Sequence, residues 1–326
     1  MTSMRWRLAC VLAAMALPGM GMAQQASATA DPSPGETCEL AYAAIPQGSI
    51  LDLLDPAAPI DRRQAALAAY QQLATMRDCP EFGYTLGLLY RHGEYLPGNL
   101  LPQDLDKARA LITPMAESGY LPAYADLAEM EMRHAQARAA MKWTQLYLHY
   151  VEKVLIPTLD DATDARFQRS AYNGNLLART ELIWRYARPS LPRKLVREDF
   201  HAYLDATGRQ VEQRMRERQA GQHLRASAQD GGPTYITGNG DGCAVNMIDR
   251  IGAASAAWIV EVLPSGKVGR VVLENFVPKA GVADTLAACL ADYRFAPFAG
   301  TAPATIRVSM VMGSPEGAAI SRKRRN

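Results

Sequence analysis

The stretch AWIVEVLPSGKVGRVVLENF (257–276) decides how the C-terminal part of this chain folds. Apolar residues dominate both of its ends, and Pro264–Lys267 between them has the composition of a tight turn. We expect a first strand that contains Trp258, Val260 and Val262, and a second strand over Val268–Phe276. The stretch therefore predicts two strands joined by a tight turn.

A helix and a last strand follow. The helix carries an apolar stripe made of Val282, Leu286, Cys289, Leu290 and Tyr293. In TIRVSMVM (305–312), apolar side chains alternate with Thr305, Arg307 and Ser309, which is typical of a strand with one buried and one wet face. Residues 243–315 therefore predict a strand–strand–helix–strand module whose helix packs on the sheet.

A family resemblance rests on three groups of residues in this module. They are Val260-Glu261-Val262, Pro264-Ser265-Gly266-Lys267-Val268 and Phe295-x-Pro297-Phe298. Together they resemble the C-terminal domain of TonB-type energy transducers. The resemblance implies a periplasmic module that binds short segments of outer-membrane proteins by strand addition at an exposed sheet edge. The candidate binding residues are Thr305, Arg307, Ser309 and Val311.

The N-terminus departs from a transducer, which needs a membrane anchor and a long proline-rich spacer. Residues 1–23 instead read as a cleavable signal peptide, with Arg5 and Arg7 before an apolar run over Leu8–Leu17. An uncleaved anchor is the alternative, but a membrane span needs roughly 20 apolar residues. We expect export to the periplasm of a Gram-negative bacterium, with a flexible leader over 24–37.

The charge balance argues against nucleic acid as a partner. The chain has 35 basic and 33 acidic residues, and removal of the signal peptide with Arg5 and Arg7 makes the two equal. A neutral chain lacks the electrostatic footprint of a nucleic-acid-binding protein. The basic cluster Arg322–Arg325 lies in a tail, 316–326, that we expect to be disordered. Beyond the signal peptide no stretch is apolar enough to cross a membrane, so membrane contact is expected only through partners.

The cysteines agree with export. Four remain after removal of the signal peptide: Cys38, Cys79, Cys243 and Cys289. An even number in an oxidising compartment suggests two disulfides, for which three pairings are possible. We prefer Cys38–Cys79 and Cys243–Cys289, because each bond then stays within one predicted domain.

Residues 38–190 have a helical pattern with an internal repeat. Segments 79–90, 119–130 and 174–185 align, with small residues at 83, 123 and 178. They resemble the Sel-one-like subclass of tetratricopeptide repeats, which implies helix pairs stacked into a solenoid. An irregular helical bundle is the alternative. Pro114 is expected to kink its helix or delay its start.

A charged segment separates the repeats from the C-terminal module. Residues 191–228 predict a capping or spacer helix with one thin apolar stripe. Residues 229–242 are rich in glycine and predict a linker. The predicted fold is thus multidomain, an α-solenoid followed by a small α+β module.

We find no pattern of residues that indicates catalysis or a cofactor. The five histidines are not spaced for a metal, and Asp160, Asp161 and Asp164 are more typical of a polar loop than of a cation site. Thr237–Gly242 lacks the lysine and the glutamate of phosphate and calcium loops. Trp143 and Trp184 are expected in the helical core.

The sequence therefore favours a non-catalytic periplasmic adaptor that binds envelope proteins, one on the concave surface of the repeats and another at the sheet edge. The alternatives are an accessory TonB-type energy transducer for outer-membrane transport and a cell-envelope enzyme. An enzyme requires a cleft with matched acid and base groups.

Overall fold

The computed structural model describes residues 34–76, 79–155, 179–180, 192–228, 233–237, 254–277, 279–290 and 293–312. Helices come first and a small antiparallel sheet follows, as the sequence predicts. The predicted signal peptide, most of the third repeat copy, Trp184, the aspartates at 160–164 and the basic tail lie outside these residues. Within them, no helix has the length and apolar character that a membrane span requires.

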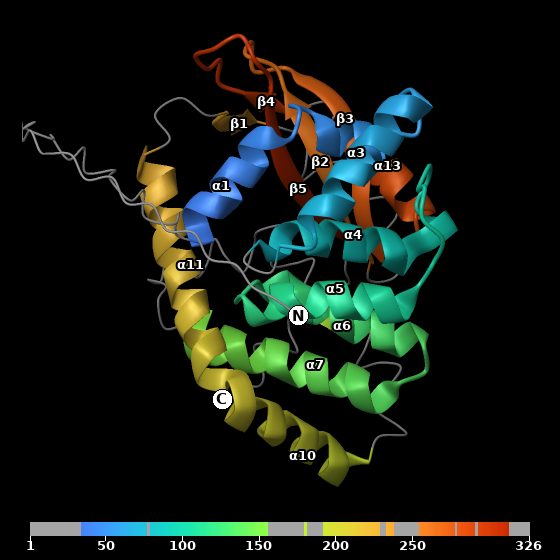
Figure 1. Cartoon of the computed structure of the whole chain (residues 1–326), viewed down its shortest axis with the longest axis vertical. Helices are drawn as coiled ribbons and strands as arrows, with labels where there is room; N and C mark the ends of the chain where they lie inside the picture. The colour runs from blue at the N-terminus through green and yellow to red at the C-terminus, as the bar shows by residue number, and fades with distance from the viewer. Residues whose placement is uncertain are drawn as a thin grey trace, which may run out of the picture.

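The helices stack one upon the next (Figure 1). The helices are α1 (Pro34–Ala44), α2 (Ser49–Leu54), α3 (Ile60–Leu73), α4 (Pro80–His92), α5 (Leu105–Glu117), α6 (Leu121–Arg133), α7 (Ala137–Tyr150) and α10 (Arg193–Tyr203), with short helical turns at Gly93–Tyr95 and Val151–Leu155. From α2 to α7 each helix contacts its neighbour in sequence, and α10 packs on α7. This arrangement buries the apolar face of each helix against the next.

Small residues in α4 allow α5 to approach closely. A Cβ at Gly87 would lie 2.6 Å from Cγ1 of Ile112 and 3.3 Å from the carbonyl oxygen of Ala108. Pro114 does not delay the start of α5, contrary to one of the two outcomes predicted for it, because it lies in the last turn of a helix that begins at Leu105. A side-chain cap starts this helix, since Asp104 accepts a hydrogen bond from the backbone N–H of Lys107.

A long helical segment crosses the ends of the stacked helices. It continues from α10 through a π-helical turn (Leu204–Gly208) into α11 (Arg209–Ala228). Figure 1 shows α11 running across the stack at one side. Arg214 donates to the carbonyl oxygen of Glu117, and Arg218 donates to Oγ of Ser118, at 3.0 Å in both cases. The segment is therefore fastened to the turn between α5 and α6.

The C-terminal sheet has three antiparallel strands in the order β3-β2-β5. They are β2 (Ala254–Val262), β3 (Val268–Val277) and β5 (Ala304–Met312). The turn between β2 and β3 requires Gly266, whose φ is +79° and whose Cβ would lie 1.9 Å from the carbonyl oxygen of Phe295. A separate two-stranded ribbon pairs β4 (Arg294–Phe295) with β1 (Tyr235–Thr237). The stretch 229–242, predicted as a linker, therefore contains a strand.

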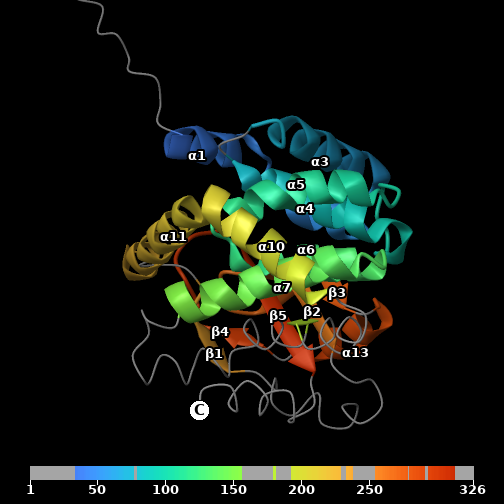
Figure 2. The ribbon, with the colours of Figure 1, turned by 90° about the horizontal axis from the view of Figure 1, so that it is seen from below.

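The sheet lies between two layers of helix (Figure 2). On one side α13 (Gly281–Leu290) contacts β2 and β3, with Leu290 fully buried. On the other side lie the stacked helices, and α2 contacts the same two strands. One hydrophobic core contains Phe82 and Leu89 of α4 together with Trp258 and Phe276 of the sheet. The helices and the sheet thus both contribute to this core.

A disulfide fastens the first helix to this core. Cys38 and Cys79 are bonded, as predicted, and the bond joins α1 to the start of α4. The helix α1 begins at Pro34, inside the stretch that was expected to be flexible up to residue 37. Proline is favoured at the first position of a helix because its φ is already set. The second predicted bond cannot be compared, since Cys243 lies outside the described residues.

Candidate functional site at the sheet edge

The strand β5 forms one outer edge of the sheet. It pairs with β2 through nine consecutive residues, from Ala304 opposite Val262 to Met312 opposite Ala254, without a shift in register. In the part of the chain that the structure describes, no strand pairs with its other side. The backbone N–H and C=O groups on that side are therefore available to an extended segment.

The four residues predicted for this site all lie on β5. Thr305 is exposed and lies opposite Glu261, whereas Ser309 is half-buried and lies opposite Ala257. The backbone of Val311 pairs with Ser255, and its side chain is outside the described set. Arg307, opposite Ile259, is 39% exposed. The predicted residues thus share one strand, but they are not all exposed to solvent.

Arg307 reaches across the sheet instead of pointing away from it. Its Nε and Nη2 atoms donate to the two carboxylate oxygens of Glu274 at 2.5 and 2.6 Å. Because Glu274 belongs to β3, this two-pronged ion pair spans the central strand β2. The Glu274 side chain is only 2% exposed, so its charge depends on Arg307 for compensation.

A bulge in β3 explains why a glutamate and an asparagine follow each other at this place. Ala257 pairs with Asn275, whereas the next residue, Trp258, pairs with Leu273. Glu274 is thus the extra residue of the bulge. Glu274 binds the edge strand, while Asn275 contacts the helices.

Asn275 joins the sheet to α4 and α6. Its amide nitrogen donates to Oδ1 of Asp126 at 3.0 Å. Its oxygen accepts from Nε2 of His92 at 2.9 Å and from Nη1 of Arg91 at 3.3 Å. Burial and the charge of Arg91 hold the pKa of His92 well below its usual value, so a neutral imidazole makes this bond. The ring of His92 also stacks on Phe276, with centroids 4.1 Å apart.

Asp126 is the centre of this buried polar cluster. It accepts hydrogen bonds from the hydroxyl of Tyr84 at 2.6 Å and from Nη1 of both Arg91 and Arg179 at 2.5 Å. Burial raises the pKa of Asp126, but the guanidinium groups of Arg179 and Arg91 outweigh it and lower the pKa to about 2. Burial likewise lowers the pKa of Arg91, to about 9. The carboxylate of Asp126 and the guanidinium group of Arg91 are therefore both charged at neutral pH.

This cluster is not among the sites predicted from the sequence, although the sequence carries a signal for it. When segments 79–90 and 119–130 are aligned, Asp126 occupies the position that Leu86 has in the first copy. Leu86 is buried in the apolar core. A carboxylate at a position that is a buried leucine in the first copy indicates a buried polar contact, because an unpaired buried charge is strongly destabilising.

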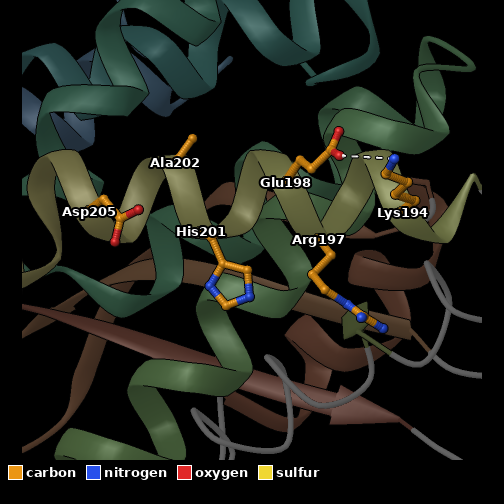
Figure 3. Close-up of a pocket in the computed structure, with 6 residues that line it drawn as sticks. All are labelled: Lys194, Arg197, Glu198, His201, Ala202 and Asp205. Carbon is orange, nitrogen blue, oxygen red and sulfur yellow. Dashed lines mark ion pairs between the residues drawn. The ribbon is translucent and has the colours of Figure 1, made fainter.

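A surface hollow on α10 offers little for chemistry (Figure 3). It is lined by Lys194, Arg197, Glu198, His201, Ala202 and Asp205. All six come from α10 and the turn that directly follows it, where they form one polar stripe. Lys194 and Glu198 lie 3.9 Å apart as an ion pair. Because every lining side chain comes from one side of one helical segment, these side chains do not surround a common point at which a substrate could bind.

The remaining predictions on chemistry can be compared only in part. No group of three or more potential metal ligands occurs within the described ranges. Trp143 is buried in the helical core against Tyr124 and Tyr203, as expected.

Comparison with known protein families, with curated proteins and with solved structures gives no match for this chain. The resemblances to the TonB C-terminal domain and to Sel-one-like repeats therefore stay predictions.

Proposed function

We propose that this protein is a non-catalytic interaction protein of the periplasm, which binds an extended segment of an envelope protein at the outer edge of β5. The observation that carries the proposal is the regular pairing of β5 with β2 over nine residues, combined with an outer side that no described strand covers. Strand addition uses the backbone groups of such an edge for affinity.

The edge of β5 lacks the features by which proteins usually protect an edge strand. Ala304–Met312 contains no proline and no lysine, and its pairing with β2 has no bulge. Its one charged side chain, Arg307, is engaged with Glu274. The opposite edge differs, because β3 has two register shifts and contacts both α2 and α13. Strand addition is therefore favoured at β5.

The helices support the sheet in this proposal. The helical repeat predicts a second partner on the concave surface of the repeats. On α4 and α6, however, Arg91, His92 and Asp126 already bind Asn275 of the chain's own sheet. Leu121–Glu131 of α6 is buried at every position. We therefore propose that these helices hold the sheet, and thus β5, in a fixed position.

The cysteines and residues 1–23 support the proposed compartment. The Cys38–Cys79 disulfide fits an exported protein, because such bonds persist in oxidising compartments. The signal-peptide features of residues 1–23 support export, and the TonB-like residues support the periplasm.

Two neighbouring proline variants test strand addition at β5. The N–H groups of consecutive strand residues point to opposite edges. Of Val308→Pro and Ser309→Pro, one therefore breaks a bond to β2 and lowers the melting temperature, whereas the other removes a donor from the outer edge only. We expect the variant that keeps its melting temperature to lose photo-crosslinks from a probe at the exposed Thr305 in cells.

A probe at the exposed Ala202 on α10 provides the control, because crosslinks from there should not depend on β5. Unchanged crosslinking from Thr305 in the folded proline variant would show that the partner does not pair with this edge.

A further inference from the structure

The guanidinium group of Arg307 has unused donors at the proposed binding edge. An arginine has five N–H donors, and the bonds to Glu274 use one on Nε and one on Nη2. The Nη1 atom donates to no other group among the residues placed in the structure. Since 39% of the side chain is exposed, these remaining donors can reach a group that approaches from outside.

The opposite face of β5 is apolar. Ile306 and Val308 are half-buried and pack against the hydrophobic core, and Met310 is 7% exposed. A strand that pairs with β5 places alternate side chains on the two faces of the sheet. Side chains on one face of such a strand therefore lie beside Ile306 and Val308, whereas those on the other face lie beside Thr305 and Arg307.

The charge of Arg307 sets a second requirement for a segment that pairs with β5. Arg307 is the one charged residue in Ala304–Met312. Opposite charges on directly paired strand residues are stabilising and like charges are destabilising. A carboxylate opposite Arg307 can accept from the free Nη1 donors, whereas a lysine or arginine at that position would be repelled.

Building on the proposed strand addition, we infer that the bound segment is an amphipathic acidic strand. It carries an aspartate or glutamate opposite Arg307 and apolar residues at the two adjacent positions, which face the side of Ile306 and Val308. Arg307 is thus a specificity-determining residue, because it selects the charge of the segment that the backbone of β5 binds.

Three synthetic peptides test this inference with the full mature chain. The first alternates valine and threonine over nine residues with a central glutamate, and the second has lysine in its place. The third has the composition of the first, with its valines and threonines in two blocks. Fluorescence anisotropy should show the glutamate peptide binding about fivefold tighter than the lysine peptide at low salt. The difference should shrink as the ionic strength rises from about 0.02 to about 0.3 M.

Two variants separate the role of Arg307 from a fault in folding. Arg307→Gln should abolish the preference for glutamate, but it also leaves Glu274 without its partner, so its melting temperature must be checked. Thr305→Lys alters an exposed residue on the same face and should increase the preference for the glutamate peptide without loss of stability, because the new lysine lies opposite Glu261.

Equal binding of the glutamate and lysine peptides overturns the inference and leaves strand addition in place. Binding of the block peptide as tightly as the alternating one overturns the amphipathic part. If none of the three binds, the inference also fails, and crosslinking of the proline variants decides separately on strand addition.

Discussion

Replacement of Asp126 by asparagine should strongly destabilise the whole protein. Asp126→Asn keeps the shape of the side chain but removes the charge that compensates Arg179 and that, together with Glu129, compensates Arg91; both arginine side chains are at most 2% exposed. Removal of one partner from a buried ion pair typically costs about 3–5 kcal/mol. We expect a loss in this range, because the asparagine oxygen can still accept from Tyr84 but no longer compensates the guanidinium charges.

Urea unfolding followed by tryptophan fluorescence measures this loss. With a slope of about 3 kcal/mol per molar urea, the midpoint should fall by roughly 1–1.7 M. Asp106→Asn is the matched control, because the Asp106 side chain is 95% exposed although it also binds an arginine. Its effect should stay within about 0.5 kcal/mol. Equal midpoints for the two variants would refute the view that Asp126 is the energetic centre of the cluster.

The pH dependence gives an independent measure of the same group. The pKa of Asp126 is about 2 in the folded protein, whereas an aspartate without these surroundings, as in the unfolded chain, has a pKa of 3.8. A depressed pKa contributes stability above the unfolded value, and that stability is lost as the pH falls toward the folded value. The difference in unfolding free energy between wild type and Asp126→Asn should therefore shrink by about 2 kcal/mol between pH 5 and pH 2. A constant difference would contradict a charged Asp126.

Three further predictions follow from the fold. Gly266→Ala should lower the melting temperature clearly more than Gly300→Ala. Both glycines have positive φ, but only at position 266 would a Cβ meet another atom. Equal losses of melting temperature would contradict the close contact between position 266 and Phe295. Replacing Cys38 and Cys79 by serine should destabilise the protein by about 3–4 kcal/mol in urea unfolding, and no change would mean that the bond contributes nothing to stability. Variants that retain only Trp143 or only Trp258 should unfold at the same urea concentration, because α4 contributes side chains both to the core around Trp143 and to the core around Trp258; two separate transitions would indicate independent domains.

The elements of the C-terminal module could be predicted because their signals are local. Alternating apolar residues and the turn at Pro264–Lys267 place β2 and β3 close to their observed bounds. The requirement for glycine at position 266 comes from its positive φ and from the approach of Phe295. In TIRVSMVM the period of two likewise identifies β5, although it cannot tell which neighbours this strand has.

The position of the sheet against the helices could not be predicted in the same way. The bond between Asn275 and Asp126 joins residues that are 149 positions apart. No periodicity reports such a contact, and the polar side chains of β5 resemble a solvent-exposed face in the sequence because their partners lie elsewhere in the chain. Only the aspartate at the repeat position of Leu86 hinted that a polar group is buried there.

Contacts between residues far apart in the sequence also limit the prediction of the candidate site. Thr305, Arg307 and Ser309 were identified from alternation, and the structure places them on an outer strand. That Arg307 spans β2 to bind Glu274 depends on the strand order and on the bulge beside Asn275, which the sequence pattern does not encode.

Crosslink mapping from two positions on β5 tests the central claim most directly. Photoreactive residues at Thr305 and at Ser309 lie on the same face of one strand, four residues apart. If a partner segment pairs with β5, the two probes should crosslink to one segment of one envelope protein, at residues about four positions apart, because paired strands advance together. Crosslinks to unrelated positions or to different proteins would contradict strand addition at this edge.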